Sequence, residues 1–472
     1  MQRRKFIRNS TFASSILIVP RHVLGGKNFI APSDQLNIAG IGVGGKGRSD
    51  LANARGQGQA RVSAMCDVDS QGKHGVLRSR KQFPKANFYA DFRELLDKER
   101  DIDAVTISTP DHTHGVIASY AMQSGKHVYV QKPLTHNIKE ARWLQKLAQK
   151  EQLVTQMGNQ GASNPSQLEV QKWVRNKEIG TISAVYVWTN RPIWPQGGKI
   201  PKANKKLKPT SLDWDLWLGP AAQTDYIHNL HPFNWRGWWE YGTGALGDMG
   251  CHIIDIPFKA LALKYPTDVE CSVGTIYDAK RNVNYFPEGC PPSSTVTLHF
   301  DPTPTNKQRI KMVWTDGGIR PSHPDLLPPE VEIESNGIIM VGDKGVITSG
   351  VYGLDPKLYK PGEPVRVGNK TSDSDLPEFG HQYKWITACK AGFNSKEHNE
   401  LTSSFDYSVP LTETVLMGNI AIRSYMLRRG SGKSIDYYGR KKLLWDGEQM
   451  RITNFEEANQ FVGRIYRKGW SI

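Results

Sequence analysis

Short apolar runs alternate with helix-compatible segments over the first third of the chain. The apolar runs are each four to six residues long, and glycine or polar positions bound them. Such runs predict buried strands, and their alternation with helices is typical of a parallel, doubly wound sheet with right-handed crossovers. The expected strands are 36–41, 61–66, 104–108, 127–130 and 154–157, and the expected helices are 45–54, 70–82, 91–98, 113–124 and 139–151.

The pattern changes beyond about residue 160, where strand-like segments follow one another without regular helices between them. This spacing favours a mostly antiparallel sheet that is covered by helices on one face. We therefore expect an α/β protein in which the doubly wound domain precedes an α+β domain with a large, mostly antiparallel open sheet. Its expected strands are 185–189, 269–275, 294–300, 309–314 and 331–334, with covering helices at 253–263 and 381–391 and a helix at 408–427 that holds Pro410 in its first turn.

The length of 472 residues exceeds what one hydrophobic core usually supports, so two domains are expected. We place a leader at 1–33, the doubly wound domain at 34–158 and an α+β substrate and oligomerisation domain at 159–430. A C-terminal extension at 431–472 is expected to pack back on the protein. Residues 191–232, rich in Pro, Gly, Lys and Trp, are interpreted as a long ordered loop near the functional site.

The first residues suggest an export signal. Arg3 and Arg4 are followed by Lys-Phe-Ile, a modest apolar stretch at 11–20 and small residues at 25–26. This order resembles a twin-arginine signal, whose pathway exports folded proteins, so a periplasmic location is expected. The apolar stretch is too short to span a bilayer, and no later segment predicts membrane insertion.

Charge and cysteine content narrow the class of protein. The net charge of +15 is spread along the chain, and the one dense lysine run, between Lys199 and Lys208, lies in the Pro/Gly-rich loop. A solvated basic loop is therefore favoured over a nucleic-acid surface. The five cysteines are widely spaced and include no CxxC pair, so neither a disulfide framework nor a metal site is expected. A single disulfide, between Cys271 and Cys290, is left as an alternative.

A glycine-rich turn follows the first expected strand and opens the first helix. The segment Gly40-Ile41-Gly42-Val43-Gly44-Gly45 satisfies G-x-G-x-x-G, and Asp67 ends the second strand. Glycines at such a turn let the backbone approach a pyrophosphate, which sits at the positive helix end, and the acid accepts hydrogen bonds from the ribose. The first domain is therefore interpreted as a Rossmann domain. Since the charge of Asp67 would repel a 2′-phosphate, NAD is favoured over NADP.

Three further motifs are candidates for the functional site. Two follow strands of the parallel sheet, at the carboxyl edge where open α/β sheets bind ligands, and the third lies in the second domain. They are Thr109-Pro110-Asp111-His112-Thr113-His114, Gln131-Lys132-Pro133, and Gly244-Ala245-Leu246-Gly247-Asp248-Met249-Gly250-Cys251-His252. With the glycine turn, they make residues 34–430 resemble the glucose–fructose oxidoreductase, inositol dehydrogenase and rhizopine-catabolism (Gfo/Idh/MocA) family. The resemblance implies an oxidoreductase with a Rossmann domain, a sugar-like substrate and a second-domain sheet that forms an oligomer face.

The resemblance also implies roles for individual residues. Lys132 matches the family lysine that approaches substrate hydroxyl and nicotinamide, and Asp248 with His252 matches its Asp-x-x-x-His pair. Gln131 is a departure, because the family usually has glutamate before the Lys-Pro pair. The residues expected to bind cofactor are Gly40, Gly42, Gly44, Gly45, Asp67, Thr109, Pro110, His112, His114, Gln131 and Lys132. Lys132, Asp248 and His252 are expected to contact substrate. Trp235 and Arg236 join them on chemical grounds, because sugars pack their C–H faces on aromatic rings and bind charged groups through their hydroxyls.

These assignments predict a mechanism and leave three functions open. We interpret His252 as the base, oriented by Asp248, and Lys132 as the group that stabilises the developing alkoxide. The first function is oxidation of a secondary hydroxyl of a sugar or glycoside, at C3 of a pyranoside, with tightly held NAD and a downstream ketosugar-processing enzyme. The second is a glycosidase that uses bound NAD transiently. The third is a non-catalytic sugar- or cofactor-binding protein.

Overall fold

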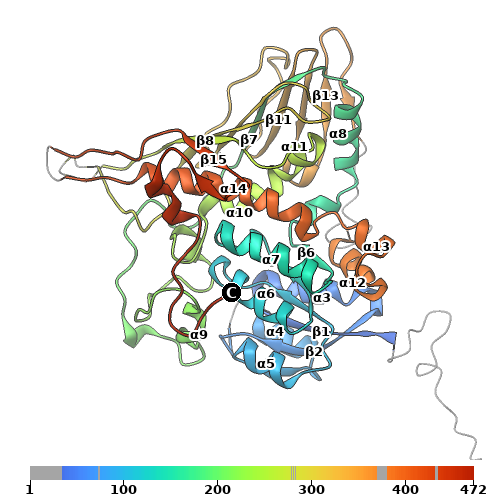
Figure 1. Ribbon diagram of the computed structural model, residues 1–472, viewed down its shortest axis with the longest axis vertical. Coiled ribbons are helices and arrows are strands. Elements are labelled where there is room, and N and C mark those ends of the chain that lie inside the picture. Colours follow the sequence, from blue (N-terminus) through green and yellow to red (C-terminus); the bar gives the residue numbers. More distant parts are fainter. Residues whose placement is uncertain are drawn as a thin grey trace, which may run out of the picture.

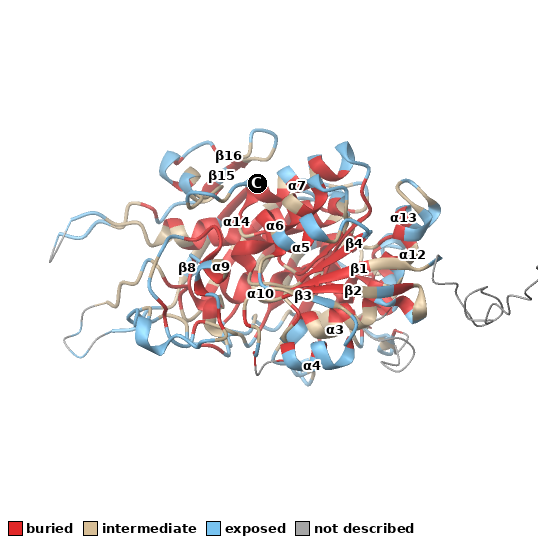
Figure 2. Cartoon of the chain, turned by 90° about the horizontal axis from the view of Figure 1, so that it is seen from below, coloured by how far each residue is buried: buried red, intermediate tan, exposed pale blue. Residues whose placement is uncertain are grey.

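The computed structural model describes residues 34–72, 75–277, 279, 281, 283–368, 380–430 and 434–472. The expected export leader at 1–33 lies outside the described residues. Two sheets dominate the described chain, and the long helix α14 (Phe405–Tyr425) crosses between them (Figure 1). Buried residues run continuously from one sheet to the other through this helix (Figure 2). No helix of the described part is long and apolar enough to cross a membrane.

The first sheet is parallel and has the strand order β3-β2-β1-β4-β5-β6. The order reverses direction at β1, which places a ligand crevice at the carboxyl ends of β1 and β4. Its strands are β1 (Leu36–Ile41), β2 (Ala60–Cys66), β3 (Asn87–Tyr89), β4 (Ala104–Ile107), β5 (His127–Val130) and β6 (Thr155–Met157), connected through α3 (Gly45–Ala54), α4 (Val76–Gln82), α5 (Phe92–Lys98), α6 (Asp111–Gln123) and α7 (Ile138–Lys150).

The second sheet has ten strands in the order β14-β13-β12-β11-β7-β10-β9-β8-β15-β16. Neighbours are antiparallel except β7 and β10, which are parallel. Alternate residues of β9 are buried, which is typical of a sheet that packs on the core with one face. The strands are β7 (Ile182–Trp188), β8 (Asp268–Val273), β9 (Ser294–Phe300), β10 (Ile310–Thr315), β11 (Gly337–Gly342), β12 (Val346–Ser349), β13 (Lys357–Tyr359), β14 (Arg366–Val367), β15 (Leu443–Asp446) and β16 (Arg451–Ile452).

Helices α8 (Ser166–Arg175), α10 (Gly244–Ile253), α11 (Asp255–Ala260) and α14 contribute their buried residues to the core beneath this sheet. The two predicted layers, a parallel Rossmann sheet and a large, mostly antiparallel sheet, are thus confirmed.

Several element predictions were wrong in detail. Residues 331–334 form no strand, because Val331 and Ile333 pack from an irregular segment against the sheet, and the strand starts only at Gly337. Helix α4 begins at Val76 rather than 70, and α14 begins at Phe405, so Pro410 lies in its second turn. The segment 381–391 is helical as α12 (His381–Ala391), yet its apolar face packs on the parallel sheet and α3 rather than on the antiparallel sheet.

Two segments outside the Rossmann sheet reach back to it. The insert, residues 190–243, holds α9 (Trp214–Leu218), has an aromatic core of its own and forms a β-bridge between Leu212 and Asp69. After β16 and a 3-10 helix (Glu456–Phe461), the last eleven residues, 462–472, run alongside the insert to a C-terminus beside α6 (Figure 1). We call residues 462–472 the C-terminal strap. All five cysteines are free, so the bridge left open between Cys271 and Cys290 is absent.

Candidate active site

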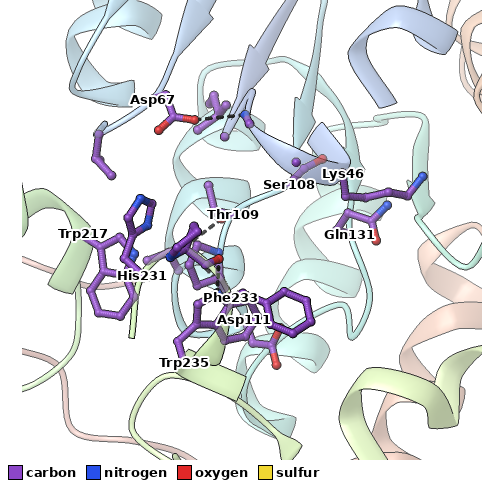
Figure 3. Close-up of a pocket in the computed structure, with 18 of the residues that line it drawn as sticks. Lys46, Asp67, Ser108, Thr109, Asp111, Gln131, Trp217, His231, Phe233 and Trp235 are labelled. Atoms are coloured by element: carbon purple, nitrogen blue, oxygen red, sulfur yellow. Dashed lines mark hydrogen bonds between the residues drawn. The ribbon is translucent and has the colours of Figure 1, made fainter. Parts of the chain in front are cut away.

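A deep cleft of about 580 Å³ lies at the carboxyl ends of the parallel strands. The Rossmann domain supplies one wall, and helix α10, the insert and the C-terminal strap supply the other. Figure 3 shows Trp217 and His231 of the insert together on one flank of this cleft and Lys46 with Gln131 on another. Of the predicted site residues, the cleft is lined by Gly42, Gly44, Gly45, Asp67, Thr109, Pro110, Gln131, Lys132, Trp235, Arg236, Asp248 and His252.

The glycine turn is built two residues later than its sequence pattern suggested. Gly42 makes the tight turn with φ +74°, and Gly44 is the N-cap of α3. A Cβ on Gly47 would lie 1.8 Å from the carbonyl oxygen of Gly42, so this helical residue must be glycine for α3 to pack on the turn. The three roles of the fingerprint therefore belong to Gly42, Gly44 and Gly47. Gly40 instead lies inside β1 against Leu51 and does not line the cleft.

This turn offers what a dinucleotide pyrophosphate needs. The N-terminus of α3 opens into the cleft, where a Cβ on Gly45 would meet nothing within 4 Å. The cleft-lining Lys46 follows and forms an ion pair with Asp50 at 2.9 Å. A helix N-terminus attracts anions through its dipole and backbone N–H groups, and no side chain blocks this one, so the residues present fit NAD.

Asp67 lies at the end of β2 and is hydrogen-bonded to the glycine turn. Its Oδ2 accepts from the backbone N–H groups of Val43 at 3.0 Å and Gly44 at 3.2 Å, and its Oδ1 accepts from the backbone N–H of Asp69 at 3.0 Å. Burial raises the pKa of this carboxyl, and the backbone hydrogen bonds oppose that rise. A carboxylate has about four acceptor positions, so Asp67 can still accept from ribose hydroxyls.

Lys132 and Asp248 meet across the two domains. Lys132 lies just after β5, and its Nζ donates to Oδ1 of Asp248 at 2.9 Å and to the backbone carbonyl of the same residue. Arg236 donates from Nε to the same Oδ1 at 3.2 Å. Burial alone would raise the pKa of Asp248, but the charges of Lys132 and Arg236 outweigh it and hold that pKa well below its usual range. The site therefore carries a fixed carboxylate between two cations.

His252 lines the same cleft one helical turn after Asp248. Its ring packs edge-on against Tyr352, with 4.9 Å between ring centroids, and its buried Nδ1 has no hydrogen-bond partner. Burial, and after it the charge of Lys132, lowers its pKa well below 6.5, so the ring is neutral. Asp248 makes no hydrogen bond to it and is instead bonded to Lys132 and Arg236. The carboxylate of Asp248 thus holds Lys132 and Arg236 in the structure, and the orienting role of Asp248 toward His252 stays a prediction.

The side chain of Gln131, the residue that departs from the family pattern, has a hydrogen-bond partner in the Rossmann domain. The Gln131 amide donates from Nε2 to Oδ2 of Asp50 at 2.9 Å, and Asp50 is completely buried. Ser108 donates to the same oxygen at 2.8 Å, and Gln382 of α12 donates to Oδ1 at 3.0 Å. A glutamate at 131 would face this carboxylate with a second negative charge, so the amide suits the buried acid at position 50.

His112 and His114 do not line the cleft. Both are buried, and their ring nitrogens face backbone carbonyls, those of Tyr241 and Trp217 for His112 and those of Pro133 and Thr109 for His114. Burial lowers the pKa of His112 to about 3. The two rings tie the start of α6 to the insert and to the turn after β5, so their contribution is to hold the site rather than to touch a ligand.

Trp235 and Arg236 form an aromatic and cationic edge near the catalytic helix. The Arg236 guanidinium lies 4.2 Å from the Trp235 ring centroid and 4.5 Å from that of Phe233. Trp235 is buried, and its indole N–H donates to the carbonyl of Pro232 at 3.2 Å. Such an edge offers a flat apolar surface and charged donors, which suit the C–H faces and hydroxyls of a sugar.

Some lining residues were not singled out in the sequence. One of them is Asp111, which lies in the motif where Thr109, Pro110 and the two histidines were expected to bind cofactor. Its Oδ2 accepts a hydrogen bond at 2.5 Å from the hydroxyl of Thr243, at the start of α10. Gly247 permits this contact, because a Cβ there would lie 1.8 Å from the Thr243 hydroxyl. Burial raises the pKa of Asp111. The remaining lining residues that went unnoticed include Lys46, Trp217, His231, Tyr352 and Trp470.

Within the described residues, no group of three or more His, Cys, Asp or Glu side chains could hold a metal ion.

Comparison with known proteins agrees with the two-domain arrangement. Residues 36–159 match the model "Oxidoreductase family, NAD-binding Rossmann fold", and residues 176–281 match the model "Oxidoreductase family, C-terminal alpha/beta domain". The chain therefore belongs to the Gfo/Idh/MocA family of oxidoreductases. This confirms the resemblance seen in the sequence and the assignment of a NAD-binding Rossmann domain.

Curated relatives include a glycosyl hydrolase family 109 protein of Shewanella sp. (strain ANA-3), 31% identical over 47% of this chain and 51% of its own length. Another, from Shewanella putrefaciens, is 29% identical over 48% of this chain and 53% of its own. The chain thus spans about half the length of these relatives.

Solved structures share the fold at low identity. An inositol dehydrogenase homologue from Azotobacter vinelandii, complexed with NADH and myo-inositol, has a TM-score of 0.54 and 16% identity, covering 83% of this chain and 96% of its own. A levoglucosan dehydrogenase with NADH and levoglucosan has a TM-score of 0.53 and 16% identity, with coverage of 82% and 97%.

Proposed function

We propose that the protein is an NAD-dependent enzyme that oxidises a secondary hydroxyl of a sugar or glycoside, at C3 of a pyranoside, to the ketone. The observation that carries the proposal is the meeting of Lys132, held by Asp248, and neutral His252 in the cleft that the glycine turn opens. The compounds bound in the two similar structures, myo-inositol and levoglucosan with NADH, support a polyol or sugar substrate.

The roles of the side chains follow from their charges. Bound NAD would accept the hydride that leaves the substrate carbon. Uncharged His252 lines the cleft and can accept the hydroxyl proton. Lys132 lies against a fixed carboxylate and supplies positive charge where the alkoxide develops. Trp235 and Arg236 are the proposed substrate-orienting edge, and Asp111 and Asp248 complete the polar lining.

The curated relatives favour a second candidate function. They are glycosyl hydrolase family 109 proteins, which suggests that oxidation could be one step of hydrolysis. A ketone at C3 acidifies the C2–H bond, so the glycosidic oxygen at C1 can leave by elimination. Addition of water across C1 and C2 would then give the free ketosugar, and the bound dinucleotide would supply the hydride that reduces C3 again, with no net change in the cofactor. Both candidates share the first step and the same residues.

The two candidates differ in net redox change. Purified protein as isolated is incubated with aryl glycosides and disaccharides while reduced nicotinamide is followed by absorbance and sugars by mass spectrometry. Reduced cofactor with a product two hydrogens lighter supports the dehydrogenase. Free sugar without net reduction supports the hydrolase. The Lys132→Ala variant tests the proposed site and is expected to lose whichever of the two activities the wild type has. An unchanged rate in that variant would contradict the proposed site.

We further propose the setting of this activity. The twin-arginine-like leader would direct the folded enzyme to the periplasm with its cofactor, and the open face of the ten-stranded sheet would form a homo-oligomer. A ketosugar product would need a partner enzyme that processes it. Arg3→Lys/Arg4→Lys is expected to retain the protein in the cytoplasm, which fractionation measures, and light scattering of the purified protein measures its mass.

A further inference from the structure

The cofactor cleft extends past the ribose-binding acid into a region that the Rossmann domain does not close by itself. Lys132 and His252 define one end of the cleft, the glycine turn its middle, and Asp67 the ribose position beyond it. A dinucleotide bound in this direction would place its adenine farther on, against the residues that follow β3 and those on α6. Here the lining residues are Ala90, Asp91, Phe92, Thr113, Ile117, Leu216, Trp217 and Trp470.

Trp470 belongs to the C-terminal strap and is held firmly at this wall. The guanidinium of Arg93 lies 4.6 Å from its ring centroid, and the ring of Phe92, at the start of α5, lies 6.1 Å away. Its backbone N–H donates to the carbonyl of Arg467 at 3.0 Å, which closes a turn at the end of the strap. An indole in this position brings a large flat apolar surface to the cleft.

The strap is anchored to the insert by Arg467. The guanidinium of Arg467 donates to the carboxylate of Asp215 at 2.5 Å, to the carbonyl of Gly219 at 2.9 Å and to the side chain of Gln223. Asp215 lies on α9, the helix whose Trp217 lines the same wall.

A second set of contacts holds the strap to both domains. Arg464 pairs with Glu240 at 3.1 Å, and the hydroxyl of Tyr466 donates to the buried carboxylate of Glu140 on α7 at 2.9 Å. The strap thus joins the insert and the Rossmann domain across the adenine end of the cleft.

We propose that Trp470 is an adenine-binding residue and that the C-terminal strap slows the release of the dinucleotide. The inference rests on the dinucleotide site and the proposed function, and it extends them to residues far along the chain from the Rossmann domain. An aromatic ring beside a base contributes enough to change its dissociation tenfold to about a hundredfold. Release of the cofactor then requires the strap to detach from the insert.

The test is the rate at which bound NADH leaves the protein. NADH fluorescence is followed after mixing the loaded protein with excess NAD, and the nucleotide that stays bound through gel filtration is quantified after denaturation. Trp470→Ala is expected to raise the dissociation rate constant about tenfold or more. Arg467→Gln, which loosens the strap outside the cleft, is expected to raise it as well. Ile465→Ala is the matched control, since this strap residue is 95% exposed, and its rate should not change.

The outcomes separate this inference from the proposed function. Wild-type release rates in folded Trp470→Ala and Arg467→Gln variants would overturn the role of the strap while leaving the NAD site intact. If the wild-type protein itself failed to bind NADH, the dinucleotide assignment and the proposed function would fail first. Circular dichroism and thermal melting show whether each variant is folded, and Trp470→Phe, expected to release NADH at an intermediate rate, tests the wall if the alanine variant does not fold.

Discussion

The protonation state of His252 decides whether this residue can act as a base. Burial and the nearby charge of Lys132 lower its pKa well below 6.5, so the ring stays uncharged where an exposed histidine would gain a proton. We expect kcat/KM to stay level between pH 7.5 and pH 6. The measurement is a pH–rate profile with circular dichroism at each pH. A bend to unit slope at about pH 6.5 would show that the base has an ordinary pKa and would contradict this environment.

Position 131 faces the buried carboxylate of Asp50, so its side chain should not carry a negative charge. Gln131→Glu would place a carboxylate where the amide now donates to buried Asp50 at 2.9 Å. Two carboxylates this close cannot both ionise cheaply, so the pKa of one rises above its unfolded value. The folded state then prefers the protonated form, and stability is lost as the pH rises through that raised pKa.

We therefore expect Gln131→Glu to melt at a lower temperature than the wild type, with a larger deficit at pH 8 than at pH 5. The double variant Asp50→Asn/Gln131→Glu exchanges amide and acid and should recover most of the loss. Equal melting temperatures for the wild type and the single variant at pH 8 would show that the two side chains do not face each other.

At the scale of elements, the turn between β1 and α3 depends on one helical glycine. A methyl group at Gly47 would lie 1.8 Å from the carbonyl oxygen of Gly42, so α3 would have to move off the turn. Gly47→Ala is expected to cost about 1–3 kcal/mol in unfolding free energy and to weaken NADH binding at least tenfold. Denaturant unfolding and fluorescence titration measure the two effects. Asn53→Ala, on the same helix, is the control and should change neither.

The sequence predicted the strands of the parallel sheet well because their residues are apolar on both faces. Strand β1 has the expected bounds, and β5 does too. Shorter elements lacked such a signal: β3 has three residues, and none of them is fully buried. The apolar alternation at 331–334 misled because Val331 and Ile333 are partly buried without pairing to a strand.

The sequence predicted those site residues that belong to short motifs, but not the contacts between residues far apart in the chain. Lys132, Asp248 and His252 all line one cleft, but the sequence could not say that Asp248 bonds Lys132, a contact between residues 116 positions apart. The register of the glycine fingerprint depended on how closely Gly47 approaches Gly42 in space. Trp470 lies just over 400 residues after Asp67, and no local pattern links the two to one cleft.

At the scale of the whole molecule, the ion pair between Arg142 and Glu413 joins the two domains away from the cleft. Arg142 of α7 donates to both carboxylate oxygens of Glu413 on α14, at 2.6 and 3.0 Å, and Glu413 is completely buried. The indole of Trp445 donates to the same carboxylate at 2.9 Å. Removing the arginine would leave a buried charge with only this neutral partner.

Arg142→Ala is therefore expected to lower the unfolding free energy by about 3–5 kcal/mol, measured by denaturant unfolding. The control is Lys98→Ala, because the Lys98–Glu94 pair on α5 is exposed and should contribute little. A loss in Arg142→Ala no larger than in the control would mean that the domains hold together without this pair.

The ten-stranded sheet ends in very short strands on both sides. Its edge strands β14 and β16 have two residues each, and their inner neighbours β13 and β15 have three and four. An edge this short offers a foreign strand too few backbone partners for stable pairing. The large sheet is therefore closed to growth by strand addition within the described residues, and we expect concentrated solutions of the folded protein to resist fibril-like association.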